Sequence, residues 1–221
     1  ASLKFTGGSS TPSAGRGPMT TPEGVAKMTD ENNDLIFYTN GSRVYAKDNS
    51  LVAQGLNGDT TQIQGVAILP KTTCKGCQAE YYIFTMRKNA AGENQVYYSI
   101  YDRKLNGGKG GVSIKNQFLS PAPSAERFGV AVSGGDYYWL QTQDADSTIL
   151  RTFKVSKAGI GAPIESVANS PVKGPSASSH FSRDGKVLAI AYVSPPSNQV
   201  DIYDFDVATG KTTFRYRIPL A

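Results

Sequence analysis

A chain of 221 residues with 23 glycines, 12 prolines, 12 tyrosines and 9 phenylalanines has the turn-rich, aromatic composition of a β protein rather than a helical one. The formal net charge of +5 comes from scattered lysines and arginines, and the absence of a clustered basic stripe argues against nucleic-acid binding. The longest apolar stretches are far too short to span a bilayer, which argues against membrane insertion.

The first unit of the chain contains three apolar segments separated by polar turns. Residues 24–28 (GVAKM) begin one segment, 35–39 (LIFYT) form the second, and 42–48 (SRVYAKD) follow an Asn-Gly turn. Short β-branched and aromatic runs bounded by Asn, Asp and Gly are typical of strands joined by tight hairpins. We therefore predict three antiparallel strands in this region.

The same order of segments recurs along the chain. The tripeptide Gly-Val-Ala of residues 24–26 opens further segments at 65–67 and 129–131. Second strands are then expected at 81–85, 137–142 and 187–192. Third strands are expected at 94–102, 147–155 and 198–206, and outer fourth strands at 112–119 and 162–168.

The spacing of these units predicts the architecture. The second strands begin 46, 56 and 50 residues apart, and a repeat of this length with three or four antiparallel strands is typical of a β-propeller blade. We predict an all-β fold, a β-propeller or partial propeller of four to five antiparallel blades. The whole chain, residues 1–221, would form one domain, and an ordinary β-sandwich is the alternative. The expected blades are 20–60, 61–120, 121–172 and 173–221.

Longer motifs carry a resemblance to a known family. They are TPEGVAKMTDENNDLIFYTNGSRVYAKD, GLNGDTTQIQGVAILPK, AEYYIFT, VYYSIYDRKLNGGKGGV, HFSRDGKVLAIAY and VDIYDFDVATGK. In this order they resemble the N-terminal, WD-repeat-like propeller region of large secreted Bacteroidetes surface and gliding-motility proteins exported by the type IX secretion system. The resemblance implies a secreted or cell-surface location, and it implies that the sequence is a fragment of a longer chain. The motif CKGC and the lack of a sorting domain depart from the family pattern.

The two cysteines, Cys74 and Cys77, are the residue pair with the clearest chemistry. They cannot complete a tetrahedral zinc site, because His180 is the only histidine in the chain and four ligands are required. We expect a disulfide that closes a small hairpin loop in an oxidising compartment. Two inert thiols are the alternative.

Other candidate sites are weaker, and no cofactor is expected. The oxygen ligands of Asp30, Asn32 and Asp34 alternate as at the start of a calcium loop, but the glycine and distant glutamate of an EF-hand are missing, so a hairpin tip is favoured. If the resemblance holds, Asp59-Thr60-Thr61 and Asp146-Ser147-Thr148 match the O-glycosylation pattern of that phylum. The acceptors would be Thr60 and Ser147.

The sequence does not favour catalysis. Ser178 and Ser179 precede His180 in the chain, but adjacency does not make a catalytic triad, and a strand-end or inter-blade hydrogen bond is the expected role of this histidine. Paired carboxylates of a propeller glycosidase could come from Glu126, Asp136, Asp144, Asp146 or Asp184. These acids are better explained as turn formers, and Trp139 as a core residue.

We therefore expect a non-catalytic, secreted cell-surface binding module that acts in adhesion or in the assembly of surface structures. Its partner would be a surface polysaccharide or a protein, bound by loops at the ends of the blades. Two alternatives stay open: a polysaccharide-acting enzyme, and a structural module that contacts further copies or the rest of a larger chain.

Overall fold

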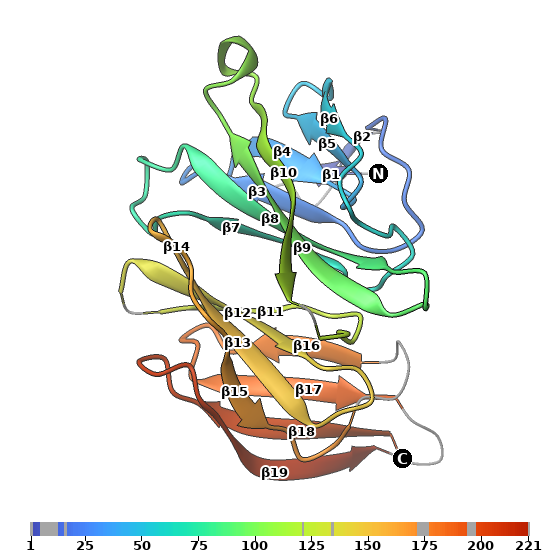
Figure 1. The fold of residues 1–221 in the computed structure, drawn as a ribbon. Helices are drawn as coiled ribbons and strands as arrows, with labels where there is room; N and C mark the ends of the chain where they lie inside the picture. Colours follow the sequence, from blue (N-terminus) through green and yellow to red (C-terminus); the bar gives the residue numbers. More distant parts are fainter. Residues whose placement is uncertain are drawn as a thin grey trace.

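The computed structural model describes residues 2–4, 13–15, 17–120, 122–133, 135–171, 177–193 and 198–220. Within these ranges the regular secondary structure is β-strand, apart from one short 3-10 turn at Asn106–Gly108. Four antiparallel sheets stack in chain order, from the N-terminal to the C-terminal end of the colour scale (Figure 1). A small hairpin of β1 (Ser2–Lys4) and β2 (Ser13–Gly15) precedes them.

Each sheet is formed by consecutive segments of the chain. Sheet 1 contains β3 (Ala26–Thr29), β4 (Leu35–Thr39), β5 (Arg43–Ala46) and β6 (Leu51–Gln54). Sheet 2 contains β7 (Val66–Pro70), β8 (Glu80–Lys88), β9 (Asn94–Asp102) and β10 (Gly111–Ser120). Sheet 3 contains β11 (Gly129–Val132), β12 (Tyr137–Gln143) and β13 (Ile149–Ser156), with β14 (Gly159–Ile160) and β15 (Ile164–Val167) both paired to β13. Sheet 4 contains β16 (Ala177–Phe181), β17 (Val187–Tyr192), β18 (Asn198–Phe205) and β19 (Thr212–Leu220).

The all-β prediction is confirmed, and most strands lie where the sequence predicts them. The ranges 35–39, 94–102 and 187–192 coincide with β4, β9 and β17, and the two predicted outer strands are β10 and β15. The sequence prediction missed β1, β2, β6, β14, β16 and β19. Four sheets, rather than the two of a β-sandwich, make up the stack.

The predicted Asn-Gly turn between β4 and β5 forms as expected. The Asn40 side chain is 5% exposed, and its Oδ1 accepts hydrogen bonds from the backbone N–H groups of Ser42 and Arg43 at 3.1 and 2.9 Å. Gly41 has a φ of +85°, a conformation that costs a residue with a Cβ about 1–2 kcal/mol. This Asn-Gly sequence therefore serves as a buried turn.

Alternation of side chains along a strand joins each sheet to both of its neighbours. In β8, Ile83 packs toward sheet 1, whereas Phe84 and Met86 pack toward sheet 3. Tyr101 of β9 stacks on Phe37 of sheet 1 with ring centroids 3.9 Å apart. This period-2 pattern is that of a sheet buried on both faces.

The interface of sheets 3 and 4 follows the same rule. Trp139 of β12 is 2% exposed and packs edge-on against Phe205 of β18, with centroids 6.1 Å apart. Its indole N–H donates to the carbonyl of Val207 at 2.9 Å. Leu140, the next residue, points the other way and belongs to the core between sheets 2 and 3. The predicted core role of Trp139 is confirmed.

Sheets 1 and 2, and likewise sheets 3 and 4, meet at both ends of their strand order. First strands approach first strands, as β3 does β7 and β11 does β16, and outer strands approach outer strands, as β6 does β10 and β15 does β19. The buried core clusters join consecutive sheets, and among the described strands none of these clusters joins sheet 1 to sheet 4. The stack is therefore open between its first and last sheets, and the four first strands lie along one side of it.

Candidate functional site

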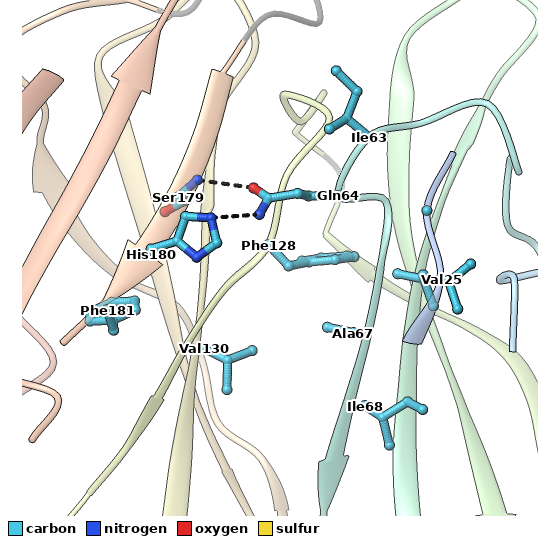
Figure 2. A pocket seen from close by; sticks show the side chains of 12 residues that line it. Val25, Ile63, Gln64, Ala67, Ile68, Phe128, Val130, Ser179, His180 and Phe181 are labelled. Atoms are coloured by element: carbon cyan, nitrogen blue, oxygen red, sulfur yellow. Dashed lines mark hydrogen bonds between the residues drawn. The ribbon is translucent and has the colours of Figure 1, made fainter. Parts of the chain in front are cut away.

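A cleft lies along the first strands of the sheets. It has a volume of about 490 Å³ and is bounded by β7, β11 and β16 and by the segment before β3 (Figure 2). Most of the side chains that line it are aliphatic or aromatic, although polar atoms make up most of its accessible surface; these side chains include Val25, Ile63, Ala67, Phe128, Val130 and Phe181. The polar side chains of the cleft are those of Gln64, Ser179 and His180. None of the lining residues carries a carboxylate, a lysine ammonium or a guanidinium, so the cleft suits a neutral ligand.

Gln64 holds three sheets together at this cleft. Its backbone forms a parallel bridge with Arg127 just before β11, and its carbonyl accepts a hydrogen bond from the N–H of Phe128 at 3.2 Å. The side-chain Oε1 accepts from the N–H of Ser179 in β16 at 3.0 Å. Figure 2 shows the amide group reaching across the cleft from sheet 2 to sheet 4.

The same contacts fix the hydrogen position on His180. Because the Ser179 N–H requires an acceptor, Oε1 of Gln64 faces Ser179, and the Gln64 amide nitrogen faces Nε2 of His180 at 3.3 Å. An amide nitrogen can only donate, so Nε2 accepts and the hydrogen of the neutral ring lies on Nδ1. The exposed imidazole then offers Nδ1–H as a donor to a ligand. The inter-sheet hydrogen bond expected for this histidine is present.

Ser179 is not paired with the histidine beside it. Its side chain is 3% exposed, and its hydroxyl donates to Oε1 of Gln141 in β12 at 3.2 Å. Ser179 and His180 point to opposite sides of β16, as successive residues of a strand do. Their contacts therefore brace sheet 4 against sheets 2 and 3 instead of forming a nucleophile and a base.

A buried arginine lies directly behind the cleft. Arg127 has no exposed surface; its Nη2 donates to Oε1 of Gln143, and its guanidinium carbon is 5.4 Å from the centroid of the Tyr192 ring. The Tyr192 hydroxyl donates to the same Gln143 oxygen at 3.2 Å. Burial lowers the pKa of Arg127, with the nearby tyrosine acting in the opposite direction. This cluster fastens sheet 3 to sheet 4.

The carboxylates considered for catalysis have structural partners. Asp144 receives two hydrogen bonds from Arg151 at 2.8 Å each, and Glu126 lies 3.3 Å from Nζ of Lys88. Asp184 accepts from the Ser182 hydroxyl at 2.6 Å within the turn before β17. Asp146, with a φ of +53°, occupies the turn between β12 and β13. These contacts agree with the turn-forming roles predicted from the sequence for Asp146 and Asp184.

The fifth of these acids, Asp136, joins sheets 2 and 3. Its Oδ1 accepts hydrogen bonds from the Thr73 N–H at 2.7 Å and from the hydroxyls of Thr72 and Thr73 at 2.9 and 2.8 Å. These hydrogen bonds lower its pKa, that from the Thr73 backbone most. Both threonines immediately precede Cys74, so the cysteine loop is anchored to the neighbouring sheet.

The cysteine loop lies at the tip between β7 and β8. Cys74 and Cys77 are exposed and joined by a disulfide, with Cα atoms 5.6 Å apart. The Cys74 N–H also donates to Oγ1 of Thr72 at 3.2 Å. The disulfide thus closes a small loop next to the Asp136 contact. The predicted oxidising compartment stays a prediction.

The calcium candidates form a hairpin tip between β3 and β4. Oδ1 of Asp30 accepts from the N–H groups of Asn32 and Asp34 at 3.0 and 2.9 Å, and Asn33 has a φ of +62°. The described residues contain no group of three or more His, Cys, Asp or Glu side chains that could hold a metal ion. The glycosylation candidates Thr60 and Ser147 are both partly exposed in turns, and their modification stays a prediction.

Sequence reasoning missed the glutamines of the site. Gln64 lies just before β7, and Gln141 and Gln143 lie within β12 and have no exposed surface. The available signal was the run YYWLQTQ, in which two glutamines occupy positions of a buried strand. A buried amide requires a partner, so such positions point to polar contacts between sheets.

The sequence matches no family model and no curated protein. Across the described ranges, no helix is both long and apolar enough to cross a membrane. The function of the cleft is therefore inferred from its own geometry.

Proposed function

We propose that this protein is a non-catalytic binding module that holds its ligand in the cleft along the first strands. In this proposal the four sheets are consecutive blades of a β-propeller or partial propeller. Their strand order supports it, because in each sheet the first strand lies on the cleft side and later strands follow outward. The stack would serve as a rigid frame for recognition, as is usual for binding sites carried on β scaffolds.

One observation carries the proposal: aliphatic side chains are exposed around a hydrogen-bonded polar centre. Val25, Ile63 and Val130 are 52%, 49% and 36% exposed in the cleft. They surround the Gln64 amide and the free Nδ1–H of His180. Exposed apolar side chains beside a few oriented polar groups are characteristic of binding sites.

A protein segment suits this cleft better than a polysaccharide. Sugars are held largely by exposed aromatic faces, whereas the exposed apolar side chains here are aliphatic and Phe128 is buried. Of the two partner classes expected from the sequence, we infer an extended, uncharged polypeptide segment with apolar side chains. Its biological setting would be adhesion or surface assembly outside the cell. The exposed disulfide supports that location, because disulfides persist in oxidising compartments.

Affinity selection with a random peptide library, run beside a polysaccharide array, tests the ligand class. We expect saturable binding of uncharged peptides and a loss of about tenfold or more in affinity for Val130→Asp, because a carboxylate would lose its hydration in the cleft. The control is Val167→Asp, at a 70% exposed position on β15. Saturable binding of a polysaccharide alone would refute the ligand class. If neither the peptide library nor the polysaccharide array gave binding, the binding role would be refuted.

The proposed location has a separate test. Protease treatment of intact cells of the source organism should remove a surface-exposed protein but spare one inside the cell. Survival of the protein on treated cells, while it is degraded in lysates, would contradict the cell-surface setting.

A further inference from the structure

The first strands of sheets 2 and 3 are edge strands, and their free edges face each other across the cleft. Among the described strands, β7 pairs only with β8, and β11 only with β12. Gln64 and Arg127 form a parallel bridge just before these strands, and the Gln64 carbonyl accepts from the Phe128 N–H at 3.2 Å. Figure 2 shows the two strands separating from this contact toward Ile68 and Val130. A parallel ladder thus begins here and, within the described strands, does not continue along β7 and β11.

The pairing of β7 with β8 determines which backbone groups of β7 point into the cleft. The Met86 N–H donates to the Gly65 carbonyl at 3.1 Å, which marks a hydrogen-bonded pair. Such pairs alternate with non-hydrogen-bonded pairs along an antiparallel ladder, and the register of β7 with β8 has no shift. The N–H and C=O groups of Val66 and Ile68 therefore point away from β8, to the free edge. Both residues line the cleft.

The same reasoning applies to β11. The Ser133 N–H donates to the Tyr137 carbonyl at 3.4 Å, and the register with β12 has no shift. Val130 therefore belongs to a non-hydrogen-bonded pair, and its N–H and C=O groups point to the free edge. The N–H of Phe128, two residues earlier, lies on the same edge and donates to Gln64, which agrees with this assignment.

These backbone groups contribute to the polarity of the cleft. Polar atoms make up most of its accessible surface, although most of its side chains are apolar. Of its three polar side chains, Ser179 is almost completely buried, which leaves Gln64 and His180. Unpaired N–H and C=O groups along a strand edge are a template for the backbone of another extended chain.

The edge of β7 also lacks the protection that the outer strand β19 carries. β7 (VAILP) contains no charged residue, and its proline, Pro70, is its last residue. β19 contains Arg215, Arg217 and Pro219. Charged residues and proline on an edge strand disfavour pairing with another chain. The sequence therefore leaves β7 open to pairing and protects β19.

We propose that the ligand of the cleft adds as a further β-strand to the free edge of β7, on the side that faces β11. This inference rests on the proposed function and adds the mode of recognition. The ligand backbone would exchange hydrogen bonds with Val66 and Ile68. Its alternate side chains would lie toward Val25 on one side and toward Phe128 and Val130 on the other. A polysaccharide does not offer N–H and C=O groups at the two-residue spacing of a strand, so this pairing requires a polypeptide.

N-methylation of a bound peptide tests the strand addition. A peptide from the library selection is synthesised in versions that each carry one N-methyl group, which removes a single N–H donor. Alternate N–H groups of a strand point to the same edge. We therefore expect two positions separated by one residue to lose about tenfold or more in affinity, because each leaves a carbonyl of β7 without its partner. Methylation of the residue between them should have a smaller effect.

Ile68→Pro and Ile68→Ala form a matched pair in the protein. Both remove the isoleucine side chain, but only proline removes the N–H that points into the cleft, and the β7–β8 hydrogen bonds remain. We expect Ile68→Pro to bind the peptide about tenfold more weakly than Ile68→Ala. Circular dichroism verifies that both variants are folded. Amide exchange of the unmodified protein, followed by NMR, gives a readout without a variant: the peptide should slow exchange at Val66 and Ile68.

Three outcomes would overturn the inference. They are a peptide that tolerates N-methylation at every position, equal affinities of folded Ile68→Pro and Ile68→Ala, and amide exchange at Val66 and Ile68 that saturating peptide leaves unchanged. In each case a peptide still binds, so the proposed function stands while the strand addition fails. If no peptide binds, the proposed function fails, and this inference fails with it.

Discussion

The turn between β18 and β19 depends on a glycine that contacts the only tryptophan. Gly210 has a φ of +75°, and its N–H donates to the Asp206 carbonyl at 2.7 Å. A Cβ at this position would lie 2.8 Å from two ring carbons of Trp139 and 3.1 Å from Cδ1 of Ile164. Gly210→Ala therefore combines a backbone penalty with overpacking between sheets 3 and 4.

Gly92→Ala separates these two effects. Gly92 has a similar φ of +81°, but an added Cβ would meet nothing within 4 Å. The left-handed conformation costs an alanine about 1–2 kcal/mol, partly offset by about 0.4–1 kcal/mol through the unfolded state. Overpacking adds about 1–3 kcal/mol. We expect a loss of about 1 kcal/mol for Gly92→Ala and about 2–4 kcal/mol for Gly210→Ala.

Urea unfolding measures the difference. Far-UV circular dichroism reports on all strands, and fluorescence reports on Trp139, the single tryptophan of the chain. Coincident transitions from both probes would justify a two-state free energy. If both variants lost the same free energy within about 0.5 kcal/mol, the contact of Gly210 with the indole ring would be refuted.

Three further predictions concern the core, acid stability and the disulfide. Phe84→Ala, at a fully buried position between sheets 2 and 3, should cost about 3–5 kcal/mol in urea unfolding, and a loss below about 1 kcal/mol would contradict its burial. Hydrogen bonds from Ser50 lower the pKa of Asp48 from 3.8 to about 2. Its stabilising contribution is therefore complete above the unfolded value and is lost as the pH falls through about 2. Between pH 5 and pH 2 the midpoint temperature of thermal unfolding should fall less steeply for Asp48→Asn than for the unmodified chain. Identical slopes would exclude this contribution of Asp48. Alkylation after reduction should add two alkyl groups at Cys74 and Cys77 that alkylation alone does not add; equal masses would disprove the disulfide.

Most strands could be predicted because interior strands read as continuous apolar and aromatic runs bounded by turn residues. In YYIFT and VLAIAY every residue is apolar or aromatic, apart from the final Thr85, and both runs lie in interior strands. The strand β19 (TTFRYRIPL) was missed because two arginines and a proline interrupt its apolar residues. An edge strand pairs with a neighbour on one side only, so it tolerates a proline and charged residues.

The site could not be predicted, because its residues meet only through the stacking of sheets. Gln64 and Ser179 are 115 positions apart in the chain, yet their hydrogen bond closes one wall of the cleft. Nothing in the residues around Gln64 distinguishes it from Gln62, which bonds to Asn94 instead. Local patterns predict strands and turns, whereas partners at this separation depend on the relative placement of three sheets.

The restriction of extensive contacts to consecutive sheets has a consequence for how the polypeptide acquires its structure during synthesis. Each sheet is complete within one continuous segment, and each interface needs only the segment that precedes it. A chain emerging from the ribosome or from an export channel can therefore fold progressively, without waiting for its C-terminal end. The same independence allows a duplicated segment of one sheet to be added at the sheet 4 end while the earlier interfaces remain unchanged.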